Sequence, residues 1–445
     1  MMRILILPSL ILIHKGVSLM KIWIVALIAA LIISYQLVHA TVAGGVPSLS
    51  LTWEASVSDR GGFVAVSNNG SIVVAAFSGS INDVVKFFDK EGNQIGYYSL
   101  SGSPIGVSLS YDGARAAVGD GNYIHIYDYD PGPHRFVNSK NISAGDSVLL
   151  GMPREDPVIV AYVIQRSYGN PELHIYDIAQ DQDQSVTISN GGSITMLAIA
   201  DSMYKDAFFI VAVGDDEGYV HLLTYDGTGI NQLDSIYMGS YTKVVSIDLS
   251  RHGYFMAVLY ENTQSGDYYV AAYQVTGTGA SEIGTSVNVG SSGSEVAMQT
   301  NDEDADYLIL IAGSGDAVVL NASAASDSLT TITSFGYPYA DDDLTDISFY
   351  GSYVVAGTTY SSGNIYLVDV YADQSDSVAD NYLTDTDMSE DASVLVVGDT
   401  NGNLRYYQTG VFEDAPVPVP EPFALILASV TSLVLIYIIL GKLGQ

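Results

Sequence analysis

A histidine recurs at the same place in three segments of alternating polarity, as His125, His174 and His221. Three imidazoles are a familiar ligand set for zinc, provided that their nitrogens lie about 2 Å from one ion. Each segment, however, predicts a β-strand of a different repeat unit, which separates the three side chains. Other units carry different residues at this position, namely Lys86, Tyr366 and Arg405. We therefore interpret it as a polar strand position and predict no metal site.

Carboxylates gather in stretches that we expect to form turns, at 215–217, 302–304 and 341–343. Calcium prefers such oxygen ligands, but no stretch has the ligand spacing of a calcium-binding loop. The nearest fragment, Asp399–Asn403, predicts a hairpin turn, because its Asn-Gly pair suits the positive φ of such turns. Calcium in the acidic turns stays open as an alternative, and no other cofactor is predicted.

Catalytic motifs are missing from the sequence. There is no phosphate-binding Gly-rich loop, no His-Glu-x-x-His, no Gly-x-Ser-x-Gly and no cysteine. Acidic pairs are frequent, but none is distinguished as a glycosidase pair. We predict no catalytic residue, and keep as an alternative an extracytoplasmic enzyme (hydrolase, lyase or cofactor-dependent oxidoreductase) with an axial site.

The elements that would position such residues belong to a unit that recurs eight times in residues 48–412, with a period of roughly 40–50 residues. Each unit has an apolar segment followed by one of alternating polarity, rich in Val, Ile, Tyr and Thr, with Gly, Asn and Asp between them. This predicts an all-β chain. Four-stranded units that bury one another radially form a β-propeller. We expect eight blades, with seven as the alternative because the fourth to sixth units are long and irregular; a sandwich would not need so regular a period.

Ring closure is predicted from the two ends of the repeats. The last unit supplies only three strands before a Pro-rich stretch, whereas Ser48–Ala55 precedes the first unit as an isolated apolar–polar segment. We expect that segment to be the outer strand of the last blade, which removes two free sheet edges.

Several third segments end in an apolar or aromatic residue followed by Asp, as at Asp89, Asp128, Asp177, Asp226 and Asp369. Aspartate at a strand end readily bonds its own turn backbone. The pattern resembles the third strand of WD-repeat propellers, although Tyr, Phe or Val stands where that family has Trp. Quinone-dependent dehydrogenases are similar in blade number only, since their repeated Trp docking motifs are missing and the chain has Trp23 and Trp53 alone.

The net charge of −34 argues against nucleic acid and anionic lipid as partners, and favours a solubilising surface. Three Asn-x-Ser sequons, at Asn69, Asn141 and Asn321, are glycosylation candidates.

Both termini are hydrophobic. Residues 1–43 have the layout of a secretory signal, with Met20 as a plausible true start, Lys21, the apolar run Ile22–Leu37 and small residues before the cleavage site. A retained signal anchor is the alternative. A Pro-rich spacer at 413–422 precedes an apolar run at 423–440 that is long enough to span a bilayer.

Pro420, Glu421 and Pro422 stand directly before that apolar run. The tail resembles a PEP-CTERM sorting signal, which implies recognition by an exosortase or archaeosortase. That family ends in a basic cluster, whereas here Lys442 stands alone, so a permanent anchor is the alternative.

We expect a secreted, membrane-tethered propeller on the extracellular face of the cell membrane. Its predicted role is that of a non-catalytic binding or scaffolding module for a protein or glycan, with no nucleic-acid partner. A propeller axis lined by convergent Asp, His or Tyr side chains would instead favour the enzyme. Self-association of the propeller would favour a third alternative, a structural component of a surface coat.

Overall fold

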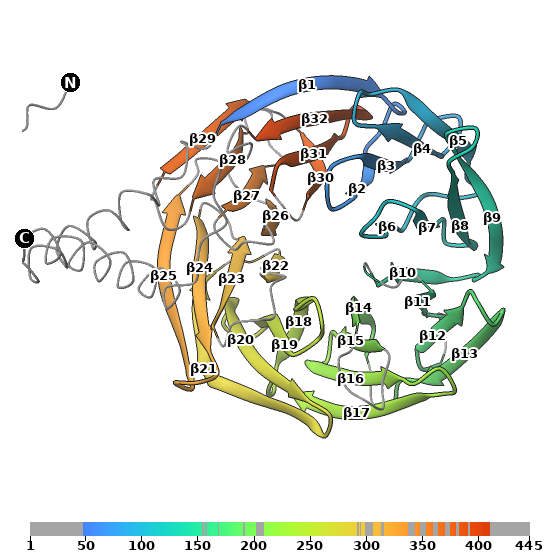
Figure 1. Ribbon diagram of the computed structural model, residues 1–445. Coiled ribbons are helices and arrows are strands. Elements are labelled where there is room, and N and C mark those ends of the chain that lie inside the picture. The colour runs from blue at the N-terminus through green and yellow to red at the C-terminus, as the bar shows by residue number, and fades with distance from the viewer. Residues whose placement is uncertain are drawn as a thin grey trace, which may run out of the picture. The chain divides into compact units, whose positions relative to one another are not determined.

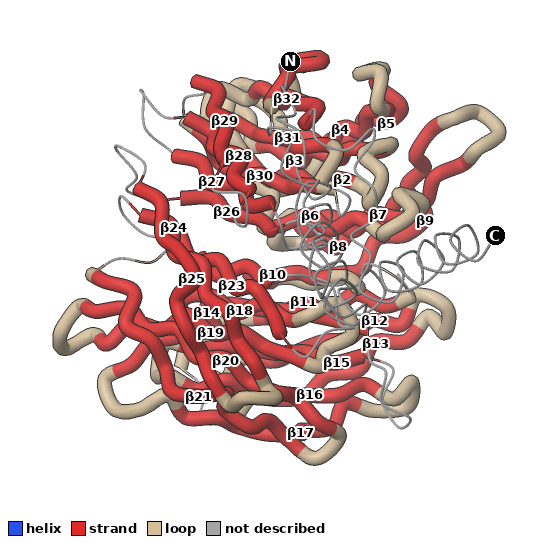
Figure 2. Tube along the Cα trace, turned by 60° about the vertical axis from the view of Figure 1, so that its left-hand side comes forward, coloured by secondary structure: helices blue, strands red, loops and turns tan. Residues whose placement is uncertain are grey.

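The computed structural model describes residues 48–409, except for short gaps at 154, 156–157, 168, 190–191, 202–208, 292, 294, 299–305, 313–315, 337–342, 348–352, 359–363, 370–373, 380–381 and 390–391. This part of the chain consists of strands and loops without a helix, which confirms the all-β prediction (Figure 2). Accordingly, none of it forms a helix long and apolar enough to cross a membrane. The predicted leader, spacer, sorting motif and C-terminal helix (1–43, 413–422, 420–422 and 423–440) lie outside the described residues.

The described strands form eight four-stranded antiparallel sheets, each built from consecutive strands except the last. The first strands of the sheets are β2 (Gly62–Val66), β6 (Gly106–Leu109), β10 (Ser147–Gly151), β14 (Ile194–Asp201), β18 (Thr242–Leu249), β22 (Glu295–Met298), β26 (Asp343–Ile347) and β30 (Leu383–Met388). The second strands are β3 (Ile72–Phe77), β7 (Arg115–Gly119), β11 (Ile159–Ile164), β15 (Phe209–Asp215), β19 (Phe255–Asn262), β23 (Asp306–Ala312), β27 (Tyr353–Thr358) and β31 (Val394–Asp399).

The third and fourth strands complete each sheet toward the rim. The third strands are β4 (Val84–Asp89), β8 (Tyr123–Asp130), β12 (Glu172–Asp177), β16 (Tyr219–Tyr225), β20 (Asp267–Thr276), β24 (Asp316–Ser323), β28 (Asn364–Asp369) and β32 (Asn403–Thr409). The fourth strands are β5 (Gln94–Ser99), β9 (Arg135–Ser143), β13 (Gln182–Thr187), β17 (Ile230–Tyr237), β21 (Gly279–Gly290), β25 (Ser328–Gly336), β29 (Gln374–Ala379) and, for the last sheet, β1 (Leu49–Ser56).

The sheets stand radially around a centre, with their first strands inward and their fourth strands at the rim (Figure 1). Each first strand contacts the first strand of the next sheet, and β30 contacts β2, so the contacts run in a closed cycle. Because each sheet buries its faces against two neighbours, no sheet needs a covering layer of helices.

The first and last parts of the described chain meet in one sheet. Strand β1 pairs antiparallel with β32, from Leu49 opposite Thr409 to Ser56 opposite Asn403. The pairing confirms the prediction that Ser48–Ala55 supplies the outer strand of the last unit. It also gives β32 a partner on its outer side, so the seam of the ring is held by a hydrogen-bonded ladder.

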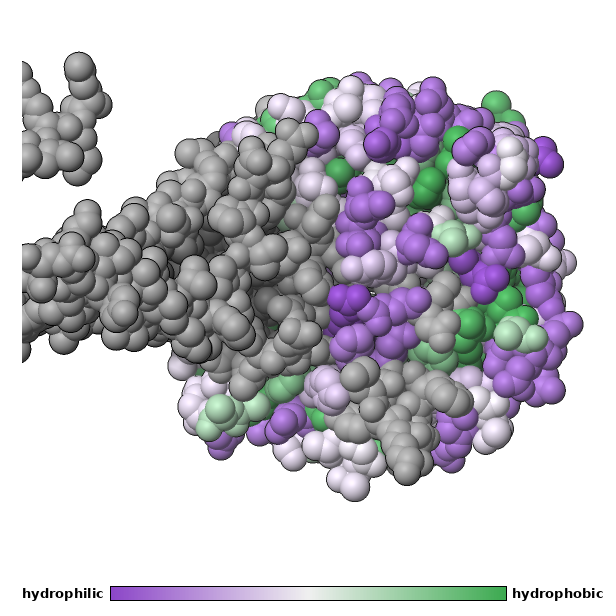
Figure 3. All heavy atoms as spheres, in the orientation of Figure 1, coloured by the Kyte–Doolittle hydropathy of each residue, from purple (hydrophilic) through white to green (hydrophobic). Residues whose placement is uncertain are grey.

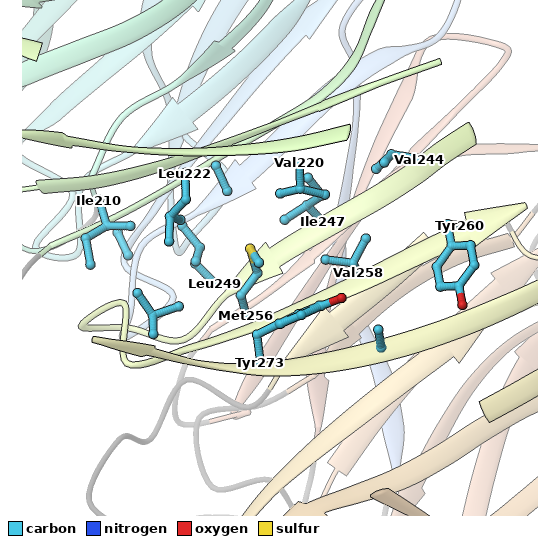
Figure 4. Close-up of a cluster of buried hydrophobic side chains, with 14 residues drawn as sticks. Ile210, Val220, Leu222, Val244, Ile247, Leu249, Met256, Val258, Tyr260 and Tyr273 are labelled. Atoms are coloured by element: carbon cyan, nitrogen blue, oxygen red, sulfur yellow. The ribbon is translucent and has the colours of Figure 1, made fainter. Parts of the chain in front are cut away.

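The core lies between neighbouring sheets and not within any one of them. Second strands are buried on both faces, as in β11 and β15, which explains their continuous apolar sequence. Figure 4 shows the layer between the fourth and fifth sheets, where Val220 and Leu222 of β16 face Val258 of β19. Each fully buried aliphatic side chain of this kind stabilises the fold by about 1.5–3 kcal/mol.

A repeated turn joins the first and second strands of four sheets. It begins at a fully buried serine whose Oγ accepts the N–H five residues later, in Ser67, Ser110, Ser250 and Ser389. The third residue after this serine has a positive φ and touches the preceding sheet; a Cβ on Gly113 would lie 2.8 Å from Ile72. Glycine meets both needs in three of these turns, and Ala392 takes the place in the turn that begins at Ser389, so the turn locks one sheet against the next.

Candidate functional site

Antiparallel strands place the loops of this unit at two opposite ends. We call one end the turn face; it carries the turns between first and second strands and between third and fourth strands. The other end, the connection face, carries the turns between second and third strands and the connections from each sheet to the next. Figure 3 shows one face, on which hydrophilic residues predominate around smaller hydrophobic areas in the described part.

The first strands line the centre of the ring and carry few groups able to do chemistry. In the part of the chain that the structure describes, they contain no His, Tyr or Cys. Their carboxylates serve neighbouring strands: the Met298 N–H donates to Asp248, and the Val66 N–H donates to Asp387, both at 2.7 Å. These bonds satisfy N–H groups at the inner edge of the sheet that follows in the ring.

Among the central carboxyls that the structure describes, Asp385 alone has a strongly perturbed acidity. Its burial raises its pKa well above the usual range, the Val64 N–H opposes this, and the carboxylates of Glu295 and Asp387 raise it further. Such a group would suit proton transfer if a reacting partner stood beside it. Asp385 instead accepts the Val64 N–H at 2.7 Å, and no cluster of three potential metal ligands occurs among the described residues. The arrangement joins β30 to β2.

On the turn face, side chains from separate sheets meet over the centre of the ring. Arg251, after β18, bonds Glu155, after β10, and its guanidinium carbon lies 4.9 Å from the ring centroid of Tyr111, after β6. The Nδ1 atom of His252 lies 3.7 Å from Glu155, whose N–H donates to Asp201 of β14 at 3.3 Å. Since β14 separates β10 from β18 in the ring, these contacts bridge non-neighbouring sheets. They connect the loops of several sheets on the turn face.

The recurring histidine has a structural partner. Asp120, at the end of β7, is 2% exposed and lies 3.0 Å from Nε2 of His125. It also accepts the Ser101 hydroxyl at 2.6 Å and the Tyr123 N–H at 2.7 Å. Burial alone would raise the pKa of Asp120, but the hydrogen bonds from Ser101, His125 and Tyr123 outweigh it and lower the pKa to about 2. The trio of Ser, His and Asp is no catalytic triad, because Ser101 and His125 both bond the carboxylate and not each other.

The same position is filled differently in other sheets. His221 lies 3.4 Å from the fully buried Asp215, and Arg405 donates to Asp399 at 2.9 Å. His174 stacks on Tyr162 with centroids 4.9 Å apart and lies 3.0 Å from Asp183. The three aligned histidines stay in three different sheets, so the structure does not bring them together. In the predicted hairpin 399–403, the Arg405 guanidinium pairs with the Asp399 carboxylate, which a bound metal cation would need as a ligand.

Lowering the pH should remove the contribution of Asp120 to stability. Its folded-state pKa of about 2 lies below the ordinary aspartate pKa of 3.8, so its contribution is complete above both values and is lost as the pH falls from about 4 toward 2. Urea unfolding gives the free energy of unfolding of the wild type and of Asp120→Asn. The gap between these two free energies should narrow by about 1 kcal/mol when the pH is lowered from 7 to 3. A gap independent of pH would contradict the carboxylate's role.

Three of the carboxylates predicted to close turns do so, whereas Asp128 lies within β8 and accepts the Arg115 guanidinium instead. Asp89 accepts the N–H groups of Glu91 and Asn93 at 3.0 and 2.8 Å. Asp226 accepts those of Thr228 and Gly229, both at 2.8 Å. Asp177 does the same for Gln180 and additionally accepts the Tyr225 hydroxyl of the next sheet at 3.3 Å. The turn role is confirmed for these residues.

The three sequons lie in different settings. Asn69 is exposed in the turn between β2 and β3, Asn141 is exposed on β9, and Asn321 is half-buried within β24. The Oδ1 of Asn69 accepts the Ser71 N–H at 3.1 Å. Asn69 and Asn141 are therefore accessible, whereas Asn321 is partly covered.

Exposed large apolar side chains gather on the connection face. Of the described residues of this kind, Leu51, Tyr97 and Ile332 lie on outer strands, whereas the others lie at or beside connection-face loops: Ile81, Tyr123, Val148, Tyr237, Tyr241 and Tyr382. Tyr241 and Tyr382 stand directly before β18 and β30 with φ of 63° and 60°. An aromatic residue in this region is strained. These tyrosines were not predicted as site residues; a Tyr just before a first strand was the available signal in the sequence.

Comparison with known proteins places the fold. No family model and no curated protein matches the sequence. Among solved structures, Sqt1 of Saccharomyces cerevisiae is similar with a TM-score of 0.61 and 12% identity over 82% of this chain and 98% of that chain. The Dos1 propeller has a TM-score of 0.60 and 11% identity over 81% and 95%, and the Myceliophteria thermophila Cps50 (Swd1) β-propeller domain 0.50 and 14% over 81% and 99%. These matches show a β-propeller fold, which confirms the propeller predicted from the sequence repeats.

Proposed function

We propose that this chain is a non-catalytic binding module, an eight-bladed propeller whose partner, a protein or a glycan, docks on the connection face. The observation that carries the proposal is the gathering of exposed apolar side chains there, with Tyr241 and Tyr382 held in left-handed conformations. Strained and exposed aromatic residues weaken a fold, so their retention favours a role in recognition.

The chemistry of the centre supports binding over catalysis. Asp248, Asp385 and Asp387 accept backbone N–H groups of neighbouring strands. Arg251 and Glu155 neutralise each other on the turn face. A catalytic group must reach its substrate, whereas these side chains are already engaged in holding sheets together.

A crosslinking experiment tests the proposal. A photo-reactive residue is placed at Ile81, Tyr123 or Tyr382 on the connection face, and at Glu91 or Asp112 on the turn face, in the full chain expressed in its own cells. We expect a discrete adduct from connection-face positions and none from the two controls. Equal labelling from both faces, or none from either, would contradict a partner on the connection face.

We also propose that the propeller is displayed on the extracellular face of the cell membrane. The signal-like residues 1–43, the apolar run 423–440 and the Pro420-Glu421-Pro422 motif support this. Intact mass of the protein from its native membrane tests it. A mass that begins near Thr41 or Gly44 and ends near Pro420 supports sorting, and one that includes Gln445 supports a permanent anchor. Display would be overturned if the measured mass still included residues 1–43 and the protein were found in the soluble fraction.

A further inference from the structure

The turn between β2 and β3 presents Asn69 to solvent on a backbone that two neighbouring sheets hold. The Asn68 N–H donates to the Tyr111 carbonyl of the second sheet at 3.0 Å. The Tyr406 hydroxyl of the last sheet donates to the Gly70 carbonyl at 3.1 Å. Gly70 is buried and Asn68 is half-buried, whereas Asn69 between them is exposed. The turn is therefore fixed on both sides of Asn69, and the side chain of Asn69 extends into solvent.

This turn also contains a complete acceptor sequence for a glycan. Asn69, Gly70 and Ser71 form an Asn-x-Ser sequon, in which the asparagine nitrogen is the atom that accepts an oligosaccharide. The Oδ1 atom of Asn69 accepts the Ser71 N–H at 3.1 Å and the Ser67 hydroxyl at 3.3 Å. The Nδ2 atom of Asn69 has no hydrogen-bond partner among the described residues. The turn thus brings Ser71 back to the carboxamide and leaves the accepting nitrogen in solvent.

The other two sequons lie in strands. Asn141 is on β9, where its Oδ1 accepts the Asn138 side-chain amide at 2.8 Å and lies 2.8 Å from Nδ1 of His125. Along an extended strand, Ser143 is about 7 Å from Asn141 and does not turn back to the carboxamide. Asn321 is half-buried in β24, which pairs with β23 and β25 on its two sides. A glycan acceptor belongs to a surface loop, and of the three sequons only that of Asn69 is in one.

We propose that Asn69 carries an N-linked oligosaccharide. This proposal rests on the extracellular display proposed above, since Asn-x-Ser glycosylation is a modification of secreted proteins. In the transfer, Nδ2 of Asn69 attacks the anomeric carbon of an oligosaccharide that is carried on a lipid-linked phosphate. The N–C bond forms while the C–O bond to the phosphate breaks, and the phosphate leaves with that electron pair. The proton of the attacking nitrogen passes to a base of the transferase.

A glycan at Asn69 would affect the two faces of the ring differently. The turn between β2 and β3 belongs to the turn face, and none of the three sequons lies in a connection-face loop. An attached glycan is bulky and hydrated, so it would keep macromolecules away from the turns around Asn69. The connection face would stay open, which agrees with the docking face proposed above.

Mass spectrometry of the full chain isolated from its own cells tests the site. A protease that cuts before aspartate separates the three sequons onto the peptides 59–82, 130–145 and 316–326. We expect peptide 59–82 to be heavier by the mass of an oligosaccharide, and the other two peptides to be unmodified. An oligosaccharide on either of the other peptides but not on 59–82 would overturn the choice of Asn69.

The equivalent turn of the second sheet supplies two matched variants, because it has Asp112 and Ala114 where the first sheet has Asn69 and Ser71. Asp112 accepts the Ser110 hydroxyl at 2.8 Å and the Ala114 N–H at 2.9 Å, so Asn69→Asp keeps the acceptor that the turn needs. Both Asn69→Asp and Ser71→Ala should keep the circular dichroism spectrum of the wild type and lose the oligosaccharide. Ser71→Thr preserves the sequon and should retain it. An oligosaccharide that persists in Ser71→Ala would contradict transfer through this sequon.

The same samples separate a failure of the glycan site from a failure of display. An unmodified peptide 59–82 would overturn glycosylation of Asn69 in every case. Display would stand if that chain lacked residues 1–43, and would fall with the glycan site if the chain kept them and were found in the soluble fraction.

Discussion

Replacing Asp399 with alanine is expected to lower the free energy of unfolding by about 3–5 kcal/mol. The carboxylate is fully buried and accepts the N–H groups of Asn401 and Asn403, both at 2.9 Å. It also pairs with Arg405 at 2.9 Å, and Arg405 reaches Glu54 of β1 at 3.0 Å. The variant would remove the buried carboxylate that pairs with the half-buried guanidinium, and would leave the turn without its acceptor. Urea unfolding of the full chain, followed by circular dichroism, measures the loss.

Asp89→Ala is a closely matched control. Asp89 accepts the N–H groups two and four residues later and the Asn93 side-chain amide, as Asp399 does with Asn401 and Asn403. It is less buried and has no arginine partner, so its removal should cost about 1 kcal/mol. Equal losses in the two variants would show that burial and the ion pair add nothing to the turn.

The parts of the fold that could be predicted from sequence are those with a local signal. Continuous apolar runs such as Ile159–Ile164 mark second strands, and alternation marks third strands. The closing strand was predictable because the last unit lacked one strand and Ser48–Ala55 was unassigned. The buried aspartates also have a sequence signal from which they could have been predicted. Asp120, Asp215 and Asp399 each follow Val-Gly and precede their His or Arg partner by five or six residues.

Contacts that depend on the closed ring could not be predicted. Arg251 meets Tyr111 although 140 residues separate them, because the two turns lie over one centre only when the sheets between them are placed. Repetition in the sequence determines what each unit is, whereas closure determines which turns become neighbours.

The many aspartates of this chain have a structural role in addition to their effect on solubility. Asp248 and Asp387 accept N–H groups of first strands in the next sheet. At the rim, Asp234 accepts the Ala280 N–H and Asp376 accepts the Leu49 N–H, at 2.9 and 2.7 Å. Each sheet has two edges with unpaired N–H groups, and carboxylates on the neighbouring sheet satisfy some of them. Aspartate is therefore part of what joins the blades.

Replacing Trp53 with alanine should open the seam between the last sheet and the first, at a cost of about 2–3 kcal/mol. Trp53 of β1 stacks on Tyr406 of its own sheet at 5.0 Å and packs against Phe88 of β4 in the next sheet at 5.6 Å. Its indole N–H donates to the Lys90 carbonyl at 3.0 Å. One side chain thus joins β1, β32 and the first sheet.

The chain has a second tryptophan, Trp23, so fluorescence is followed in a Trp23→Phe background, in which Trp53 alone reports on this seam. In that background, we expect the fluorescence and circular dichroism transitions in urea to coincide, because release of β1 exposes the edge of β32 and removes the closure on which the ring depends. Leu51→Ala, at a residue 52% exposed on the same strand, should change the stability by less than about 0.5 kcal/mol. A fluorescence transition at a much lower urea concentration than the circular dichroism transition would contradict this. It would show that β1 detaches while the other sheets stay folded, so that the ring does not depend on closure by β1.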